Sequence, residues 1–221
     1  IDVLNFCMKD KNLRDRILDS AKKNNIRVFF GNYTNKPPIA GTLYMLLAGS
    51  FKIFKICNKG KYDVVMPRSL LGGIFALILK KFSKVEIVYE SDGLMLDERL
   101  EFGGWKRNGI LHKVFQKIEK SLVLKSNYII VRTNHTKALL IERYNIAYPE
   151  NLIVIPNGKD SFLYKPISPN SKLKCREKYS LNVEDKILVY IGSLGKQYMP
   201  ELILKIFSEA NKKILNLKLL L

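Results

Sequence analysis

Histidine and cysteine are scarce in this sequence, and long apolar runs are absent. Neither of the two histidines, His112 and His135, nor any of the three cysteines has a partner at metal-ligand spacing, which argues against a structural zinc site. The cysteines are also odd in number and far apart, so we expect reduced thiols in a cytoplasmic protein rather than a disulfide framework. The longest run of apolar residues and glycine, Leu70–Leu79, is too short to span a bilayer.

Acidic residues are also few: 38 Lys and Arg residues stand against 20 Asp and Glu residues, a formal net charge of +18. Such a charge favours anionic partners, namely phosphorylated substrates, nucleic acid or an anionic membrane surface. The lysines are spread over many segments and no nucleic-acid-binding motif accompanies them, so no nucleic acid partner is expected. A composition rich in lysine throughout is the simpler explanation of the charge.

Short apolar runs alternate with amphipathic stretches along the chain. The expected strands are residues 2–7, 26–30, 62–66, 85–89, 128–131, 152–155, 186–191 and 215–221. The expected helices are residues 13–21, 42–56, 70–82, 110–123, 138–144, 172–179 and 199–212. This alternation predicts an α/β fold with a parallel sheet covered by helices on both faces, which binds ligands at the carboxyl ends of its strands.

The stretch Asn151–Pro166 divides this series. The apolar run Leu152–Ile155 is followed by Pro156, which ends ladder donation, and by Asn157-Gly158, which favours a turn. A polar, proline-flanked passage comes next, and then the alternation starts again. We therefore predict a first domain at residues 1–164 and the beginning of a second, incomplete one at residues 165–221.

One candidate site lies in the turn Gly192-Ser193-Leu194-Gly195-Lys196, between an expected strand and an expected helix. Small residues allow a phosphate to approach the backbone, the start of a helix offers free N–H groups, and Lys196 adds positive charge. Glycine that serves only to turn the chain is the alternative. The turn matches neither the dinucleotide fingerprint nor a Walker motif.

A second candidate site combines loops that follow three first-domain strands. The expected loop Glu90–Gly104 is acidic, and its Asp92-Gly93 and Glu98 are suited to binding hydroxyl groups or, for the carboxylates, to proton transfer. Arg68-Ser69 and Arg132 follow neighbouring strands and are suited to holding an anionic or hydroxylated ligand. A solvated loop, exposed arginines and a helix cap at Thr133 are the alternatives. For the lysines of the helix 110–123, attraction to anionic lipid is a secondary reading beside simple solvation.

The order of these segments resembles a family 4 glycosyltransferase of GT-B architecture. The residues that carry the resemblance are Ser126-Asn127 with Tyr128–Val131 and Arg132-Thr133, then LIVIPNG at 152–158, then Phe162 and Pro166, then LVYIGSLG at 188–195. The family pattern "K-I-x-V-I-P-N-G-V-D" is met here with Lys159 in place of the usual Val. The pair Asp92-Gly93 stands where the family often has His-Gly.

The resemblance implies two Rossmann-like domains, with an acceptor bound by the first and a nucleotide sugar by the second. It implies that the sugar is transferred with retention of configuration and that neither a metal nor a cofactor is needed. It also implies a role in surface polysaccharide synthesis, in which the acceptor is a glycan or a lipid-linked molecule at the cytoplasmic face of the membrane. Asp92 would then be catalytic, and Arg68, Ser69, Gly93, Glu98 and Arg132 would bind the acceptor. Asn157, Gly158, Gly192, Ser193, Gly195 and Lys196 would bind the donor.

Two departures from the family pattern are visible. Ser193 stands where the family often has Arg, and the paired glutamates that hold the donor are expected beyond residue 221. We therefore expect an internal fragment that lacks both ends and is inactive alone. A non-catalytic module that binds nucleotide sugars or glycans, or a GT-B sugar-nucleotide epimerase, is the alternative.

Overall fold

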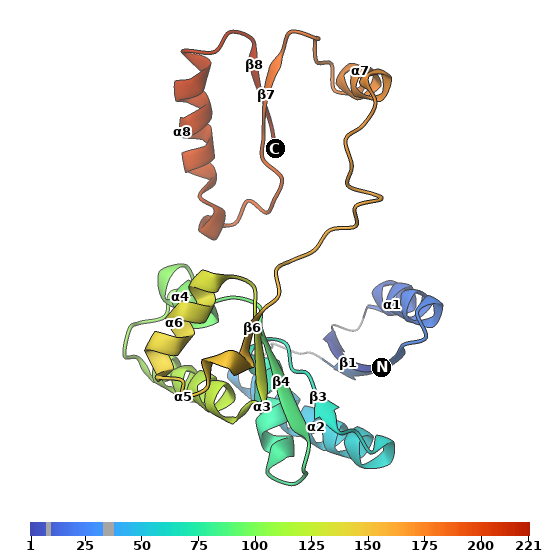
Figure 1. Ribbon diagram of the computed structural model, residues 1–221, viewed down its shortest axis with the longest axis vertical. Helices are drawn as coiled ribbons and strands as arrows, with labels where there is room; N and C mark the ends of the chain where they lie inside the picture. The colour runs from blue at the N-terminus through green and yellow to red at the C-terminus, as the bar shows by residue number, and fades with distance from the viewer. Residues whose placement is uncertain (8–9, 33–37) are drawn as a thin grey trace. The chain divides into compact units, whose positions relative to one another are not determined.

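The computed structural model describes residues 1–7, 10–32 and 38–221 and divides the chain into two compact units (Figure 1). The N-terminal unit comprises Ile1–Asp97 and Trp105–Pro156, and the C-terminal unit comprises Glu98–Gly104 and Asn157–Leu221. The division after Pro156 falls within the stretch Asn151–Pro166 that the sequence suggested as the divide, eight residues before the predicted boundary at 164.

In the N-terminal unit, strands alternate with helices along the chain. Its strands are β1 (Asp2–Cys7), β2 (Arg27–Asn32), β3 (Val64–Val65), β4 (Glu86–Ser91), β5 (Tyr128–Val131) and β6 (Leu152–Val154). Its helices are α1 (Lys11–Lys23), α2 (Pro38–Gly60), α3 (Ser69–Lys80), α5 (Ile110–Lys125), α6 (Asn134–Tyr144) and the 3-10 helix η1 (Pro149–Asn151). The helix α4 (Met95–Glu101) begins in this unit.

Every strand pair in the described residues is parallel. β1 pairs with β2, Asp2 lying opposite Arg27, while β3, β4, β5 and β6 form a four-stranded sheet in that order. Because neighbouring strands run in the same direction, their carboxyl ends meet at one edge of that sheet. The α/β fold with parallel strands is therefore confirmed, although the described residues of this unit form two sheets where the sequence suggested one.

The core of the N-terminal unit lies between the four-stranded sheet and its helices. Its most buried side chains each expose 2% or less and come from α3, β4, α4, α5, β5, α6 and β6: Leu70, Ala76, Ile87, Tyr89, Leu96, Leu122, Ile129, Val131, Leu140 and Leu152. Gly73 of α3 is buried, and a side chain there would meet Leu122 of α5. Glycine at position 73 thus allows α3 to pack closely on α5.

Two helices depart from the sequence prediction. The stretch expected as a loop, Glu90–Gly104, contains α4, whose Leu96 is buried in the core. The helix α5 begins at Ile110 as expected but ends two residues later, at Lys125. Two apolar residues of its first turns are not buried, since Ile110 is 83% exposed and Val114 is 47% exposed. The buried face instead includes His112 and Glu119, whose polar atoms have partners inside the unit.

The C-terminal unit contains α7 (Pro169–Lys178), β7 (Lys186–Val189), the 3-10 helix η2 (Lys196–Tyr198), α8 (Pro200–Asn211) and β8 (Leu217–Leu220). β7 and β8 pair in parallel, with Lys186 opposite Leu217. Among the described residues of this unit no apolar side chain is fully buried, and Leu202, Leu204 and Ile206 of α8 are about half exposed.

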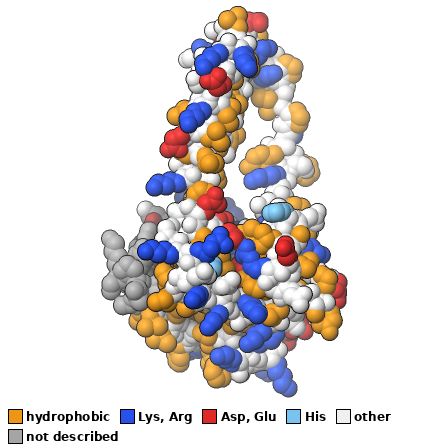
Figure 2. Space-filling view, turned by 90° about the vertical axis from the view of Figure 1, so that its left-hand side faces the viewer, with side chains coloured by type: hydrophobic (Ala, Val, Ile, Leu, Met, Phe, Trp, Pro, Cys, Tyr) orange, Lys and Arg blue, Asp and Glu red, His pale blue; other side chains and the backbone are white. Residues whose placement is uncertain are grey.

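Basic side chains are dispersed over the surface. On the face shown in Figure 2, Lys and Arg side chains are scattered among apolar and neutral ones rather than gathered in one patch. No helix among the described residues is long and apolar enough to cross a membrane.

Candidate functional site

Charged side chains gather at the carboxyl edge of the four-stranded sheet. Arg68 follows β3, Glu90 and Asp92 lie at the end of β4, and Arg132 follows β5. The backbone brings the first two strands together here, because the N–H of Glu90 donates to the carbonyl of Pro67 at 3.0 Å and Arg68 forms a parallel bridge with Glu90. The parallel topology alone thus assembles residues that are up to 64 positions apart in the sequence, from 68 to 132.

Asp92 lies between two guanidinium groups. Arg68 Nε and Nη2 both donate to Asp92 Oδ2, at 3.0 and 2.7 Å. Arg132 Nε lies 3.5 Å from the other oxygen, Oδ1. The Asp92 side chain is 39% exposed and that of Arg68 is 65% exposed, so the pair is open to a ligand.

Arg132 ties the strand ends together. Its Nη2 forms an ion pair with Glu90 Oε1, and its Nη1 donates to the carbonyl of Ile155 at 3.2 Å, so it links β4 and β5 to the residue after β6. Its Nε is buried and makes no hydrogen bond with the described residues, since the contact with Asp92 lacks hydrogen-bond geometry. This N–H is therefore a buried, unused donor at the site.

Of the other predicted acceptor residues, Ser69 and Gly93 lie next to the charged residues in the sequence, whereas Glu98 lies apart from them. Ser69 is exposed, has a left-handed backbone with φ of 68°, and begins α3 directly after Arg68. Gly93 is exposed, and its carbonyl accepts from Ser91 Oγ at 3.4 Å. Glu98 is an exposed residue of α4 that makes no ion pair with the described residues, and it is assigned to the C-terminal unit. The structure therefore groups Arg68, Ser69, Asp92, Gly93 and Arg132 but does not join Glu98 to them.

The predicted donor residues lie at two places in the C-terminal unit. Asn157 and Gly158 are exposed at its beginning, and a side chain at Gly158 would meet nothing within 4 Å. Gly192, Ser193, Gly195 and Lys196 lie together in the connection from β7 to α8. The sequence predicted that this turn leads directly into the helix, whereas η2 intervenes and contains Lys196.

Tyr190 shapes that connection. Its hydroxyl group donates to the carbonyl of Ser193 at 2.6 Å, which places the ring across the turn. A Cβ atom at Gly192 would lie 2.8 Å from the Tyr190 hydroxyl oxygen, so a larger residue there would have to displace the end of the Tyr190 ring. Lys196 is exposed and is the first residue of η2, directly after the cap residue Gly195, and no described residue forms an ion pair with it.

Comparison with known proteins identifies the family. Residues 12–161 match the profile of Glycosyltransferase Family 4. The chain belongs to this family. A curated relative of this Family 4 chain is D-inositol 3-phosphate glycosyltransferase of Corynebacterium aurimucosum, which is 23% identical over 194 residues. The alignment covers 83% of this chain and 43% of that protein, so the Family 4 chain spans less than half of this relative.

Solved structures show the same fold. A glycosyltransferase from Rickettsia africae superposes with a TM-score of 0.62 at 16% identity, over 99% of this Family 4 chain and 59% of that one. Sucrose-phosphate synthase from Thermosynechococcus elongatus superposes with a TM-score of 0.68 at 13% identity, over 99% of this chain and 60% of the synthase chain. Anabaena HepE in complex with UDP and glucose superposes with a TM-score of 0.67 at 14% identity, over 99% of this chain and 59% of the HepE chain. The predicted family and GT-B fold are confirmed.

The sequence analysis missed a buried polar cluster of this Family 4 chain. Glu119 of α5 is 2% exposed, accepts a hydrogen bond from the Tyr144 hydroxyl group, and lies 3.4 Å from Arg143 Nη1. Arg143 Nη2 also donates to both oxygens of Asp97 in α4, at 2.8 and 2.9 Å. Burial raises the pKa of the Glu119 carboxyl group, although the Tyr144 hydrogen bond and the Arg143 charge lower it.

This cluster stabilises the helix that follows the Asp92 loop, because it joins α4 to α5 and α6. A signal was present in the sequence: Glu119 lies four and three residues from Phe115 and Leu122, on the apolar face of the helix. The described residues contain no group of three or more His, Cys, Asp or Glu side chains placed to hold a metal ion.

Proposed function

We propose that this chain is part of a glycosyltransferase that moves a sugar from a nucleotide-sugar donor to an acceptor. The observation that carries the proposal is the Family 4 match over residues 12–161. Two further findings support it: the GT-B fold shared with three solved structures, one of which holds UDP and glucose, and the charged site at the sheet edge.

Arg68, Asp92 and Arg132 form the acceptor side of this proposal. Guanidinium groups suit anionic groups and hydroxyl oxygens, and the exposed side of Arg68 leaves donors free for a ligand. Both Asp92 oxygens face guanidinium groups, so its proposed role in catalysis is to orient the reacting hydroxyl group and the arginines rather than to work as an isolated base. Ser69 and Gly93 border the same ligand space, and Glu98 is a further proposed acceptor residue.

The connection from β7 to α8 forms the donor side, together with Asn157 and Gly158. Closed glycine turns bring backbone N–H groups close to a diphosphate, and Lys196 supplies the positive charge that stabilises it as the glycosidic bond to the donor breaks. We propose transfer with retention of configuration and without a metal ion, as the resemblance implies.

For the acceptor we propose a glycan or a lipid-linked glycan of surface polysaccharide synthesis, used at the cytoplasmic face of the membrane. The net charge of +18 supports attraction to an anionic membrane surface. The name of the curated relative describes action on a phosphorylated cyclitol. An anionic acceptor of that kind would suit the same pair of arginines.

A non-catalytic module is the second candidate, because Ser193 stands where the family often has Arg. Assaying the full-length gene product with UDP- and GDP-sugars, with and without a chelator, separates the candidates. Sugar transfer that persists in chelator supports the proposal. Binding without turnover supports the module, and a new sugar nucleotide formed without acceptor indicates an epimerase; either result would refute the transferase.

A further inference from the structure

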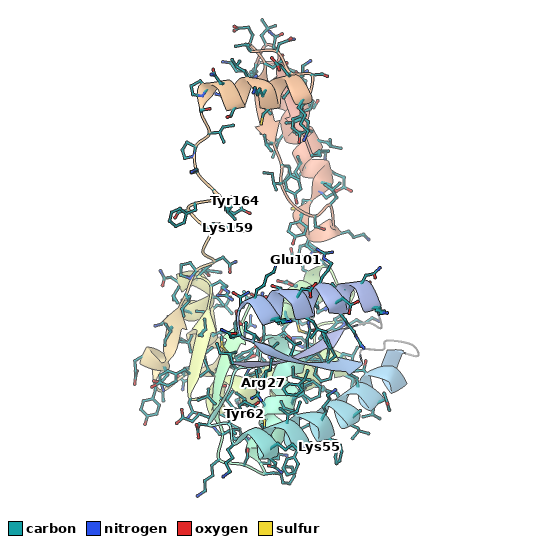
Figure 3. The ribbon with its side chains drawn as sticks, turned by 90° about the vertical axis from the view of Figure 1, so that its right-hand side faces the viewer. Arg27, Lys55, Tyr62, Glu101, Lys159 and Tyr164 are labelled. Atoms are coloured by element: carbon teal, nitrogen blue, oxygen red, sulfur yellow. The ribbon has the colours of Figure 1, made fainter. Side chains whose placement is uncertain are left out.

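The N-terminal unit contains a cavity of about 410 Å³ that none of the proposed sugar-transfer residues lines. Its walls come from β2, from the second half of α2 and from the segment that leads into β3: Arg27, Phe29, Lys52, Lys55, Ile56, Lys59, Gly60 and Tyr62. Figure 3 labels Arg27, Lys55 and Tyr62, which lie near one another on these three segments. We call this space the basic cavity.

The basic cavity lies at the amino-terminal edge of the strands. Arg27 is the first residue of β2 and pairs with Asp2 at the start of β1, while Tyr62 comes two residues before β3. The proposed acceptor residues follow the carboxyl ends of β3, β4 and β5. Because parallel strands place their amino and carboxyl ends at opposite edges, the two sites are separate.

The charges that line the basic cavity have one sign. Four of its eight lining residues are cationic and none is acidic. Lys55 and Lys59 are exposed, lie one turn apart on α2 and form no ion pair in the described part of the chain. Lys52 donates to the carbonyl of Phe30. Cations that converge on a concave surface without a carboxylate attract a multiply charged anion.

One wall of the cavity is fixed before any ligand binds. Arg27 Nε and Nη2 donate to the two oxygens of Asp2 at 2.9 and 2.7 Å, and the Tyr62 hydroxyl group also donates to Asp2. The Asp2 side chain is 8% exposed, so its charge is covered by these two partners. A side chain at Gly60 would meet the Tyr62 ring, and glycine therefore allows the ring to lie against the end of α2.

We propose that the basic cavity is a second ligand site, which binds a phosphate-bearing molecule. Lys55 and Lys59 would hold the phosphate group, and Phe29, Ile56 and Tyr62 provide an apolar wall for the group attached to it. The chemistry fits both a soluble phosphate ester and the headgroup of an anionic lipid.

Titration calorimetry of the full chain with inorganic pyrophosphate tests the site. Lys55→Gln/Lys59→Gln should weaken binding by about tenfold, because two charges that face the ligand are lost. The control Lys174→Gln/Lys178→Gln removes the same charge at the same spacing from exposed positions of α7 and should bind like the wild type. An equal loss in both variants, or unchanged binding in the first, overturns the site.

Co-sedimentation with phosphatidylglycerol vesicles distinguishes the two sources of phosphate. If a lipid headgroup is the ligand, the wild type binds vesicles, pyrophosphate competes, and the α2 variant binds more weakly than the α7 control. If the ligand is soluble, pyrophosphate binds in the same variant-dependent way while vesicles do not. Binding of neither probe to the wild type overturns the proposal. Because neither measurement depends on sugar transfer, the outcome is independent of the proposed activity.

Discussion

Arg68 places both Nε and Nη2 on a single oxygen of Asp92, at 3.0 and 2.7 Å, and leaves the other oxygen to Arg132 at 3.5 Å. The two arginines differ in burial, since the Arg68 side chain is 65% exposed and that of Arg132 is 22% exposed. One carboxylate thus connects a surface cation to a largely buried one. Removal of the guanidinium group should therefore have different effects at Arg68 and at Arg132.

The first prediction concerns stability. Arg68→Ala should change the free energy of unfolding by about 1 kcal/mol or less, because an exposed ion pair contributes little. Arg132→Ala should cost about 3 kcal/mol, since it leaves Glu90, 13% exposed, without its ion-pair partner and frees the carbonyl of Ile155. Urea unfolding of both variants measures the difference. Equal losses would contradict the assignment of separate roles.

The second prediction concerns activity at the same site. In the full-length protein, Arg68→Ala should lower kcat/KM by about 100-fold, because a charge-assisted contact with the acceptor and the partner that orients Asp92 are both lost. Arg107→Ala removes an exposed arginine that forms no ion pair in the described residues and should leave kcat/KM unchanged. Full activity in Arg68→Ala would remove Arg68 from the acceptor site.

The third prediction concerns the donor side. Lys196→Gln should weaken UDP or GDP binding by about fivefold to tenfold, since one charge that faces the diphosphate is removed. Lys205→Gln on α8 takes away the same charge from an exposed position of the same unit and serves as the matched control. Calorimetry with each nucleotide measures both. Equal affinities for the two variants would mean that Lys196 does not contact the phosphates.

Much of the candidate site followed from the sequence. The bounds of β1 and β5 were predicted as the structure has them, and β5 in particular is an apolar run between two polar residues. Once the strands are assigned, parallel pairing requires that Arg68, Asp92 and Arg132 meet at one edge, and the structure brings them together. The Thr133 cap was also considered, and its Oγ1 accepts from the Thr136 N–H at 3.0 Å.

Tertiary contacts account for the two features that were not predicted from the sequence, the buried Glu119 and the basic cavity. The buried face of α5 includes Glu119 because Tyr144 and Arg143, 24 or more residues away, provide hydrogen bonds for its carboxylate. Periodicity alone assigns a carboxylate to the solvent side. The basic cavity was missed for a related reason, since its lysines lie on a helix and its walls on two other segments, at the edge where ligands of such sheets are not usually sought.

The fourth prediction uses two adjacent glycines of α3. Gly73→Ala should destabilise the chain by about 1–3 kcal/mol, because the new methyl group meets Leu122, which is fully buried and cannot move aside. Gly72→Ala should stabilise it by about 0.5–1 kcal/mol, since the atoms nearest to a methyl group there are those of Pro67, at 3.7 Å or more, and alanine favours the helix. Thermal unfolding compares them. Similar shifts would contradict close packing of α3 on α5.

The fifth prediction concerns pH. Burial raises the pKa of Glu119 above the ordinary value of 4.5. The folded chain therefore binds the Glu119 proton more tightly than the unfolded chain does, and this stabilisation is fully present below about pH 4.5 and is lost as the pH rises through the folded pKa. Glu119→Gln keeps an acceptor for the Tyr144 hydroxyl group but cannot titrate. The wild type should consequently lose stability relative to Glu119→Gln as the pH increases.

Urea unfolding of both proteins between about pH 4 and pH 8 measures this difference. Glu142→Gln is the matched control, because Glu142 is exposed on α6 beside the same Arg143 and forms no ion pair with the described residues; the change of the stability difference with pH should be larger for Glu119→Gln than for this control. A wild type that gains stability over Glu119→Gln with rising pH would mean that the Arg143 charge outweighs burial. Glu119 would then be an ionised partner that holds α5 to α6, and the pKa of its carboxyl group would lie below the ordinary value.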